Sequence, residues 1–186
     1  MKPLNQKNTT NPYLTRIRSV FALAAALAAP SLFAANGTWT NAPVDNTWIN
    51  TNNWVGQVVP GQVNNTANNG VDGSVATFNA PISSGIGGVG NPILIDDATV
   101  AGGKGRMLLS MIFDTASCGA YAFYSPSPAA LETATTPETG VLNLCHNGSV
   151  TMNAAVTNSQ VFLLPVEIRL PSSTWGVFNF INNSTT

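Results

Sequence analysis

The feature that most constrains the fold of this chain is that nothing after residue 35 shows helical periodicity of useful length. From there to Thr186, short runs of β-branched and aromatic residues alternate with Gly, Asn, Pro and Ser. Such runs, separated by turn-forming residues, are typical of β-strands joined by tight connections. The sequence therefore predicts an all-β protein.

The expected strands are short and evenly spaced along the chain. After the first segment, which includes Val75–Asn79, they are Pro92–Ile95, Met107–Phe113, Ala120–Tyr124, Val141–Leu144, Val150–Met152, Gln160–Leu164, Val166–Leu170 and Val177–Phe180. Even spacing of this kind fits a sandwich, a barrel or a β-solenoid.

A recurring motif favours the solenoid. Ala76–Asn79, Met111–Asp114 and Gly176–Asn179 share a small or apolar start, then Phe, then Asn or Asp. In a parallel stack, Phe can pack on Phe inside, and Asn side chains can bond one another at the turn. We therefore expect a parallel β-helix, with a β-sandwich as the alternative.

The first 35 residues predict a signal peptide. Lys2, Lys7, Arg16 and Arg18 form a basic leader without Asp or Glu, and Val20–Ala29 is an apolar run. That run has the length of a signal-peptide core and is shorter than the roughly 20 residues of a transmembrane helix. Cleavage is expected after Ala34 or Ala35. A buried N-terminal helix is the alternative.

Export would leave a sparsely charged chain. Removing the leader keeps three basic and all eight acidic residues, a net charge of 3 − 8 = −5. Nucleic-acid binding requires clustered Lys and Arg, and so does a polybasic membrane patch. We therefore expect neither of these partners, and no membrane span in this chain.

The exported part is expected to have two regions. Residues 36–90 form a cap containing Trp39, Trp48 and Trp54, because a solenoid needs an atypical unit over its open end. Residues 91–186 form the first coils, which we expect to continue beyond Thr186, since no closing cap follows. An uncovered end would also allow self-association.

Two groups of residues have competing interpretations. Trp39, Trp48 and Trp54 are a candidate aromatic platform for sugar rings, although Trp is more often core. Cys118 and Cys145 are a candidate disulfide closing a loop of 28 residues, which would stabilise the fold by about 3 kcal/mol. Two unpaired, buried thiols are the alternative.

Other reactive patterns fit structural roles better. Asp96–Asp97 could act as paired carboxylates in glycoside hydrolysis, but Asp is also favoured in turns. Asp72 and Asp45 could be calcium ligands, but they too are residues favoured in turns. Cys145 and His146 are adjacent on an expected strand and would point to opposite faces. We therefore predict no catalytic residues, no metal site and no cofactor.

The order of several short motifs is informative. They are Thr38–Trp39, Asn53–Trp54, Val59–Pro60 and Ala76–Phe78, then Met111–Asp114, Ala120–Tyr121, Gly140–Leu144, Gly148–Met152, Val156–Gln160, Phe178–Asn179 and Asn182–Asn183. In this order they resemble the opening of bacterial proteins with autotransporter-associated β-strand repeats. The resemblance implies a right-handed parallel β-helix in a large surface-displayed passenger, and it supplies no catalytic residues.

The expected function is therefore structural and adhesive. A stalk at the cell surface, associated with the outer membrane or released outside the cell, would meet a polysaccharide or a host surface. The alternative is a secreted carbohydrate-binding or polysaccharide-degrading β-helix protein.

Overall fold

The computed structural model describes residues 35–63, 73–95, 106–126, 140–169 and 177–185. These residues belong to one unit, Phe33–Thr186. Residues 1–34, and with them nearly all of the predicted signal peptide, lie outside the described ranges, so that prediction stays open.

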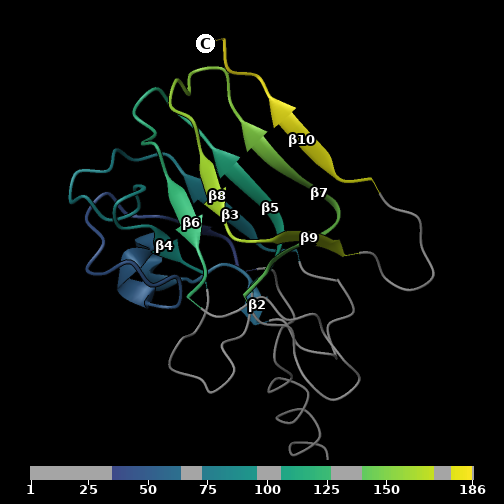
Figure 1. The fold of residues 1–186 in the computed structure, drawn as a ribbon, viewed down its shortest axis with the longest axis horizontal. Coiled ribbons are helices and arrows are strands. Elements are labelled where there is room, and N and C mark those ends of the chain that lie inside the picture. The colour runs from purple at the N-terminus through teal and green to yellow at the C-terminus, as the bar shows by residue number, and fades with distance from the viewer. Residues whose placement is uncertain (1–34, 64–72, 96–105, 127–139, 170–176, 186) are drawn as a thin grey trace, which may run out of the picture. The chain divides into compact units, whose positions relative to one another are not determined.

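The described strands form two sheets (Figure 1). The larger has the order β1 (Gly37–Thr38), β3 (Val75–Phe78), β5 (Arg106–Phe113), β7 (Leu142–Met152) and β10 (Asn179–Asn182). In the same sheet, β2 (Gln62–Val63) pairs with β5 and β9 (Val166–Arg169) pairs with β7. The smaller sheet has the order β4 (Ile93–Leu94), β6 (Ala122–Tyr124) and β8 (Val161–Leu163).

The pairing is almost entirely parallel. Among the named strands only β2 and β5 pair antiparallel. From β3 to β8 the chain alternates between the larger and the smaller sheet, so successive strands of one sheet are always separated by a strand of the other. The all-β prediction is confirmed. The structure does not match the β-sandwich alternative, because β-sandwiches such as the immunoglobulin fold are built from antiparallel sheets.

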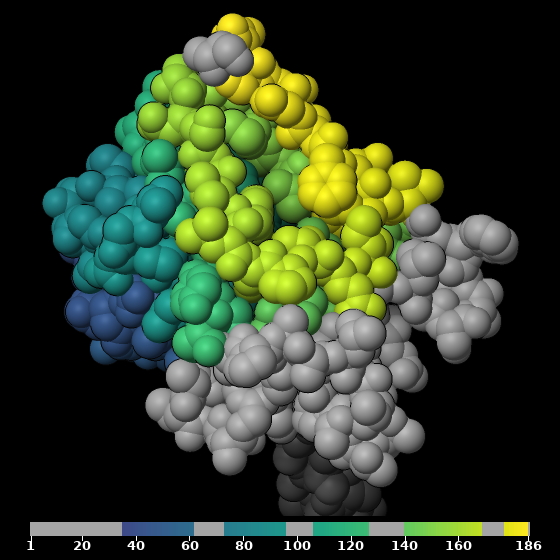
Figure 2. Space-filling model, viewed as in Figure 1, coloured from purple at the N-terminus to yellow at the C-terminus, as the bar shows by residue number. Residues whose placement is uncertain are grey.

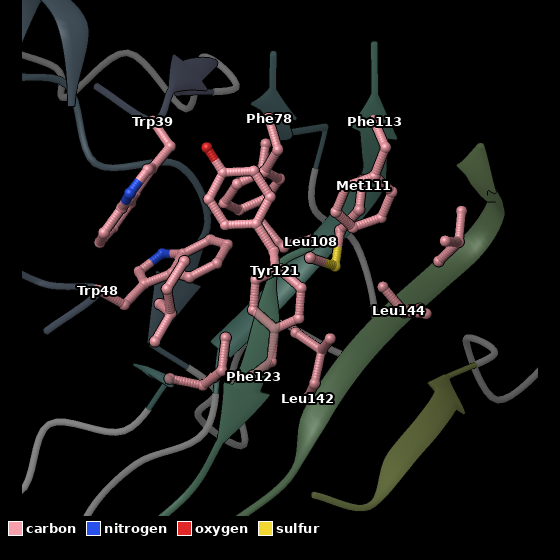
Figure 3. Packing of buried hydrophobic residues seen from close by; sticks show 14 of the residues in the cluster. Trp39, Trp48, Phe78, Leu108, Met111, Phe113, Tyr121, Phe123, Leu142 and Leu144 are labelled. Atoms are coloured by element: carbon pink, nitrogen blue, oxygen red, sulfur yellow. The ribbon is translucent and has the colours of Figure 1, made fainter. Parts of the chain in front are cut away.

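Aromatic side chains fill the space between the sheets (Figure 3). Phe78 of β3 stacks on Phe113 of β5 with ring centroids 5.4 Å apart, and Phe123 of β6 stacks on Phe162 of β8 at 5.1 Å. Phe78 also contacts Phe123 across the two sheets at 5.1 Å. The predicted Phe-on-Phe packing is therefore confirmed for the first two copies of the motif.

The prediction for the third copy of that motif is wrong. The register aligns Phe78 with Phe113, then with Met152 and Asn182. Asn179 instead aligns with Ser149, so Phe178–Asn179 is offset from the earlier copies. Met152 occupies the position at which the repeat predicted a Phe. The alignment follows strand register, which places apolar residues inward, and does not depend on the identity of the residue.

Two predicted strands are joined by an irregularity. Val141–Leu144 and Val150–Met152 belong to one strand, β7, whose register against β5 shifts between Leu108 and Ser110. Asn147 has a φ of 61° there, and it is followed by the buried Gly148. A left-handed Asn and an adjoining Gly are typical of such bulges.

Candidate functional site

The outward side chains of the larger sheet form a regular surface, which we call the polar face. One row across the strands contains Thr38, Thr77, Ile112, Thr151 and Ile181, each aligned with the next by strand register. A neighbouring row contains Val75, Ser110, Ser149 and Asn179. Ser110 is 8% exposed, and the residues between these positions, such as Ala76, Met111 and Val150, are also buried. The polar face thus follows from the two-residue alternation of side chains along a strand.

Hydrogen bonds order the polar face. Ser149 and Ser110 have their hydroxyl oxygens 3.4 Å apart, and the Thr151 hydroxyl donates to Ser149 Oγ at 3.1 Å. The Ser149 backbone N–H also donates to Ser110 Oγ at 3.0 Å. These side chains are therefore held in position before any partner binds.

A ladder of amide and carboxylate groups borders the polar face where the strands end. It consists of Asn79, Asp114, Asn153 and Asn183. The backbone N–H groups of the last three donate hydrogen bonds to the carbonyl oxygens of Phe78, Phe113 and Met152 on the neighbouring strands. Asn153 Nδ2 donates to Asp114 Oδ1 at 2.9 Å. That bond, together with one from the Thr115 N–H, lowers the pKa of Asp114 below its usual value. The predicted side-chain bonding at the turns is therefore observed for one pair, Asp114 and Asn153, whereas Asn183 joins the ladder through its backbone N–H.

The chemistry of the polar face is that of a neutral, hydrogen-bonding lattice. Its rows carry hydroxyl, amide and methyl groups, and Asp114 at the border supplies the charge. Neighbouring strands lie about 4.8 Å apart, and outward residues repeat roughly every 6.6 Å along a strand.

The tryptophans do not form an exposed platform, which corrects that candidate. Trp39, Trp48 and Trp54 are 1%, 0% and 2% exposed. Their rings contact one another at 4.7–5.1 Å and pack on Phe78 at 6.0–6.3 Å. The indole N–H of Trp48 donates to Pro60 O, and the indole N–H of Trp54 donates to Trp48 O. Burying the three indole rings against Phe78 stabilises the fold more than exposing them to solvent would.

The loop carrying these tryptophans is organised by Asp45 and Asn53. Asp45 Oδ1 accepts hydrogen bonds from the Thr47 N–H, the Thr47 hydroxyl and Asn53 Nδ2, and Oδ2 accepts one from Asn50 Nδ2. Burial raises the pKa of Asp45, but these hydrogen bonds outweigh it and leave the pKa below its usual value. The carboxylate of Asp45 is therefore engaged within the loop, which corrects its candidacy as a calcium ligand. Asp72, the other calcium candidate, lies outside the described residues.

Replacing Asn53 by alanine is expected to destabilise the chain by about 2–4 kcal/mol. Its side chain is fully buried, donates to Asp45 Oδ1 and Thr47 O, and accepts from the Val44 N–H. Its loss would leave several buried groups without partners. Urea unfolding followed by tryptophan fluorescence measures the change. Asn52→Ala, one position away and exposed, is the matched control. Equal stability of both variants would contradict the role given to Asn53.

The structure keeps the two cysteines as separate buried thiols. Cys118 Sγ donates to Phe78 O at 3.3 Å, where β3 ends, whereas Cys145 follows Leu144, which aligns with Leu108. Phe78 aligns with Phe113, about four residues beyond the position of Cys145 on β7, so the two sites are separated by roughly 13 Å along the strands. A disulfide needs Cα atoms about 4.4–6.8 Å apart. The candidate disulfide is therefore not formed.

The environment of Cys118 is that of a structural thiol. Burial raises its pKa to about 11, which keeps the sulfur protonated. Nearby, burial raises the pKa of Tyr121, whose hydroxyl donates to Ala80 O at 2.8 Å. Both side chains donate hydrogen bonds to the backbone at the end of β3, Cys118 to Phe78 O and Tyr121 to Ala80 O.

Cys145 and His146 occupy the irregular part of β7, where Cys145 is buried and His146 is half-buried. Within the described residues, no group of three or more His, Cys, Asp or Glu side chains is placed to hold a metal ion. Asp96 and Asp97, the paired acids considered for glycoside hydrolysis, lie outside the described ranges.

Comparisons with protein-family models, with curated proteins and with solved structures give no match to this chain. Across the described parts of the chain, the structure contains no helix with the length and apolar character needed to cross a membrane.

Sequence reasoning missed the residues of the polar face. Ser110, Ile112, Ser149 and Thr151 lie in or beside predicted strands, but those predictions did not distinguish the two faces of a strand. The alternation in Ser149–Asn153, where polar and apolar residues take turns, is the signal that could have identified an outward row.

Proposed function

We propose that this chain is an exported, non-enzymatic structural protein. Its strands would be the first coils of a parallel β-solenoid, and its polar face would attach it to a neutral polysaccharide at or outside the cell surface. The observation that carries the proposal is the polar face, whose side chains are aligned across β1, β3, β5, β7 and β10 by strand register.

The solenoid is supported by the alternation of the chain between two parallel sheets. The core extends as stacked rows of aromatic and aliphatic residues from coil to coil, as expected when each repeat packs on its neighbours. The buried Trp39, Trp48 and Trp54 cluster covers Phe78 at one end of these rows, in the manner of a cap. Export is supported by the basic leader and its apolar run, and a surface passenger by the order of motifs that resembles autotransporter-associated repeats.

The partner follows from the chemistry of the polar face. A charged ligand would be expected to select Lys, Arg or several carboxylates, whereas the rows contain Thr, Ser, Asn and aliphatic residues. A neutral polysaccharide offers hydroxyl groups at regular intervals, each able to donate and accept hydrogen bonds. A lattice of fixed donors and acceptors gains affinity through many weak contacts made at once.

Co-sedimentation with insoluble cellulose and chitin tests this proposal. The wild-type chain should bind one of them, and Thr151→Glu should weaken binding by about tenfold or more, because it places a charge at the centre of the neutral rows. Thr157→Glu is the matched control, since Thr157 is exposed in the connection between β7 and β8 and is not part of the polar face. Circular dichroism should show the same fold for both variants.

Absence of wild-type binding to either polysaccharide would contradict the proposed partner. Equal loss of binding in the two variants would contradict the assignment to the polar face. Release of soluble sugars from the pellet would favour the polysaccharide-degrading alternative.

A further inference from the structure

The first strand of the fold begins directly at the predicted cleavage site of the signal peptide. The backbone nitrogen of Ala35 donates a hydrogen bond to Ser74 Oγ at 3.0 Å, and Asn36 Oδ1 accepts one from the Val75 N–H at 2.9 Å. β1 follows at once and pairs in parallel with β3. No spacer therefore separates the candidate cleavage sites, after Ala34 and after Ala35, from the first strand.

The tryptophan loop, residues 39–60, encloses β1. A Cβ on Gly37 would meet Val58 O at 2.5 Å and Pro60 Cδ at 2.6 Å, so the end of the loop lies directly against this strand. Gly37 is buried as a result. The strand is thus paired with β3 and is also covered by the loop.

The tryptophan loop is itself attached to the smaller sheet. The Trp48 N–H donates to Leu94 O, and the Leu94 N–H donates to Asn46 O. Figure 2 shows this part of the chain, in blue, packed against residues coloured teal. Exposing β1 would therefore require the loop to be released from the fold.

A peptidase cannot use the folded start of this chain as a substrate. Proteolysis takes place on exposed, locally unfolded chain, and an extended peptide is held through its backbone groups and side chains. On the C-terminal side of either candidate bond, the backbone or side chains of residues 36–38 are engaged with β3, and Gly37 is covered by the loop. Cleavage must therefore precede the docking of β1.

The two candidate bonds differ in what they leave behind. A signal peptide is cut after small residues at the first and third positions before the bond. The third position is Leu32 for a cut after Ala34 and the bulkier Phe33 for a cut after Ala35. A cut after Ala34 also keeps the nitrogen that donates to Ser74 Oγ, whereas a cut after Ala35 removes it.

We infer that the signal peptide is hydrolysed between Ala34 and Ala35 before β1 docks, and that the new α-amino group of Ala35 then donates to Ser74 Oγ. As the amide C–N bond breaks, water supplies a hydroxyl group to the Ala34 carbonyl carbon and a proton to the Ala35 nitrogen. The resulting ammonium group makes a charge-assisted hydrogen bond with the hydroxyl oxygen of Ser74, which is 1% exposed. The inference rests on the export proposed above.

Export of the 186-residue chain from a Gram-negative host tests the position of the cut. The intact mass of the chain recovered from the periplasm and the medium should correspond to residues 35–186. An exported chain that begins at any other residue, or that keeps its leader, would overturn the inference and leave export standing. A full-length chain found only in the cytoplasm would overturn both.

The order of cleavage and folding is tested with the purified, full-length precursor. Bacterial leader peptidase is added either at the moment of dilution from urea or after the tryptophan fluorescence has reached its native value. The refolded precursor should be cleaved about tenfold more slowly or less, because cleavage then depends on the small population of opened chain. Equal rates in the two experiments would overturn the inference.

Gly37→Ala is the matched variant for that experiment. The added Cβ prevents β1 from docking beneath the loop and leaves the residues before the bond unchanged, so the refolded variant should be cleaved several-fold faster than the wild type. Gly90→Ala, where a Cβ has open space, should behave as the wild type does. Equal protection of Gly37→Ala and Gly90→Ala would contradict the protective role of β1.

Deleting Ala35 tests the bond to Ser74. The cut after Ala34 then leaves Asn36 as the first residue, and the melting temperature of the exported chain should fall by about 2–4 °C. In a Ser74→Ala background the same deletion should cause no further fall, because the acceptor is already absent. Equal falls in both backgrounds would show that the Ala35 amino group does not bind Ser74.

Discussion

The Gly148→Ala variant should lose about 3 kcal/mol or more of its free energy of unfolding, which is enough to unfold a marginal domain. A Cβ at this position would overlap the backbone carbonyl oxygen of Leu109 on the neighbouring strand. Backbone atoms cannot rotate away as a side chain can, so β5 and β7 would have to separate at the point where their register shifts. Urea unfolding followed by tryptophan fluorescence and circular dichroism measures the loss.

The matched control for this change is Gly90→Ala. Gly90 is exposed and is not among the glycines with positive φ, and a Cβ added there would have open space around it. Alanine there should be neutral or should stabilise the chain by up to about 1 kcal/mol, since it reduces the entropy of the unfolded state. If Gly148→Ala were as stable as Gly90→Ala, the close approach of β5 and β7 would be wrong.

Phe78→Ala should destabilise the chain by about 3–5 kcal/mol, the second large effect. Phe78 is fully buried and lies between the tryptophan cluster and the aromatic residues of β5 and β6. Its ring is 5.0 Å from that of Tyr121 and 6.0 Å from those of Trp48 and Trp54. Removing it would leave a cavity that rings of fixed shape on either side cannot fill.

Tryptophan fluorescence reports this change directly, because the three tryptophans pack on Phe78. We expect a lower urea midpoint and a red-shifted native emission maximum as water reaches the cluster. Val44→Ala, at a site that is 63% exposed, should change neither quantity. A Phe78→Ala variant with wild-type stability would show that the tryptophan loop does not depend on packing against β3.

Strand positions were predictable from the sequence because they depend on local composition. The runs ending at Phe78, Phe113 and Tyr124 are strands in the structure, and so is the run around Phe162. The stacking of Phe78 on Phe113 was also predictable, because both follow a similar apolar lead. Phe178 shared the same motif and was nevertheless misplaced, since β10 pairs with β7 four residues out of the expected alignment.

The candidate sites were less predictable, because they depend on which groups meet. The tryptophans were recognised as important, but their burial depends on a loop that packs them against Phe78 of β3. The sequence left open whether Cys118 and Cys145 pair, and strand register separates them along the sheet. The polar face was missed because its members come from five strands that are distant in the sequence.

The sequence by itself determined the all-β class and the positions of most strands, because β-branched runs and turn residues act over a few neighbouring residues. Only the tertiary structure decided between parallel pairing and the sandwich alternative, placed Met152 and Asn183 in the rows of Phe78 and Asn79, and left Phe180 exposed although it aligns with the buried Val150. Register is decided by burying one face of every strand at once, and that requirement involves all the strands together.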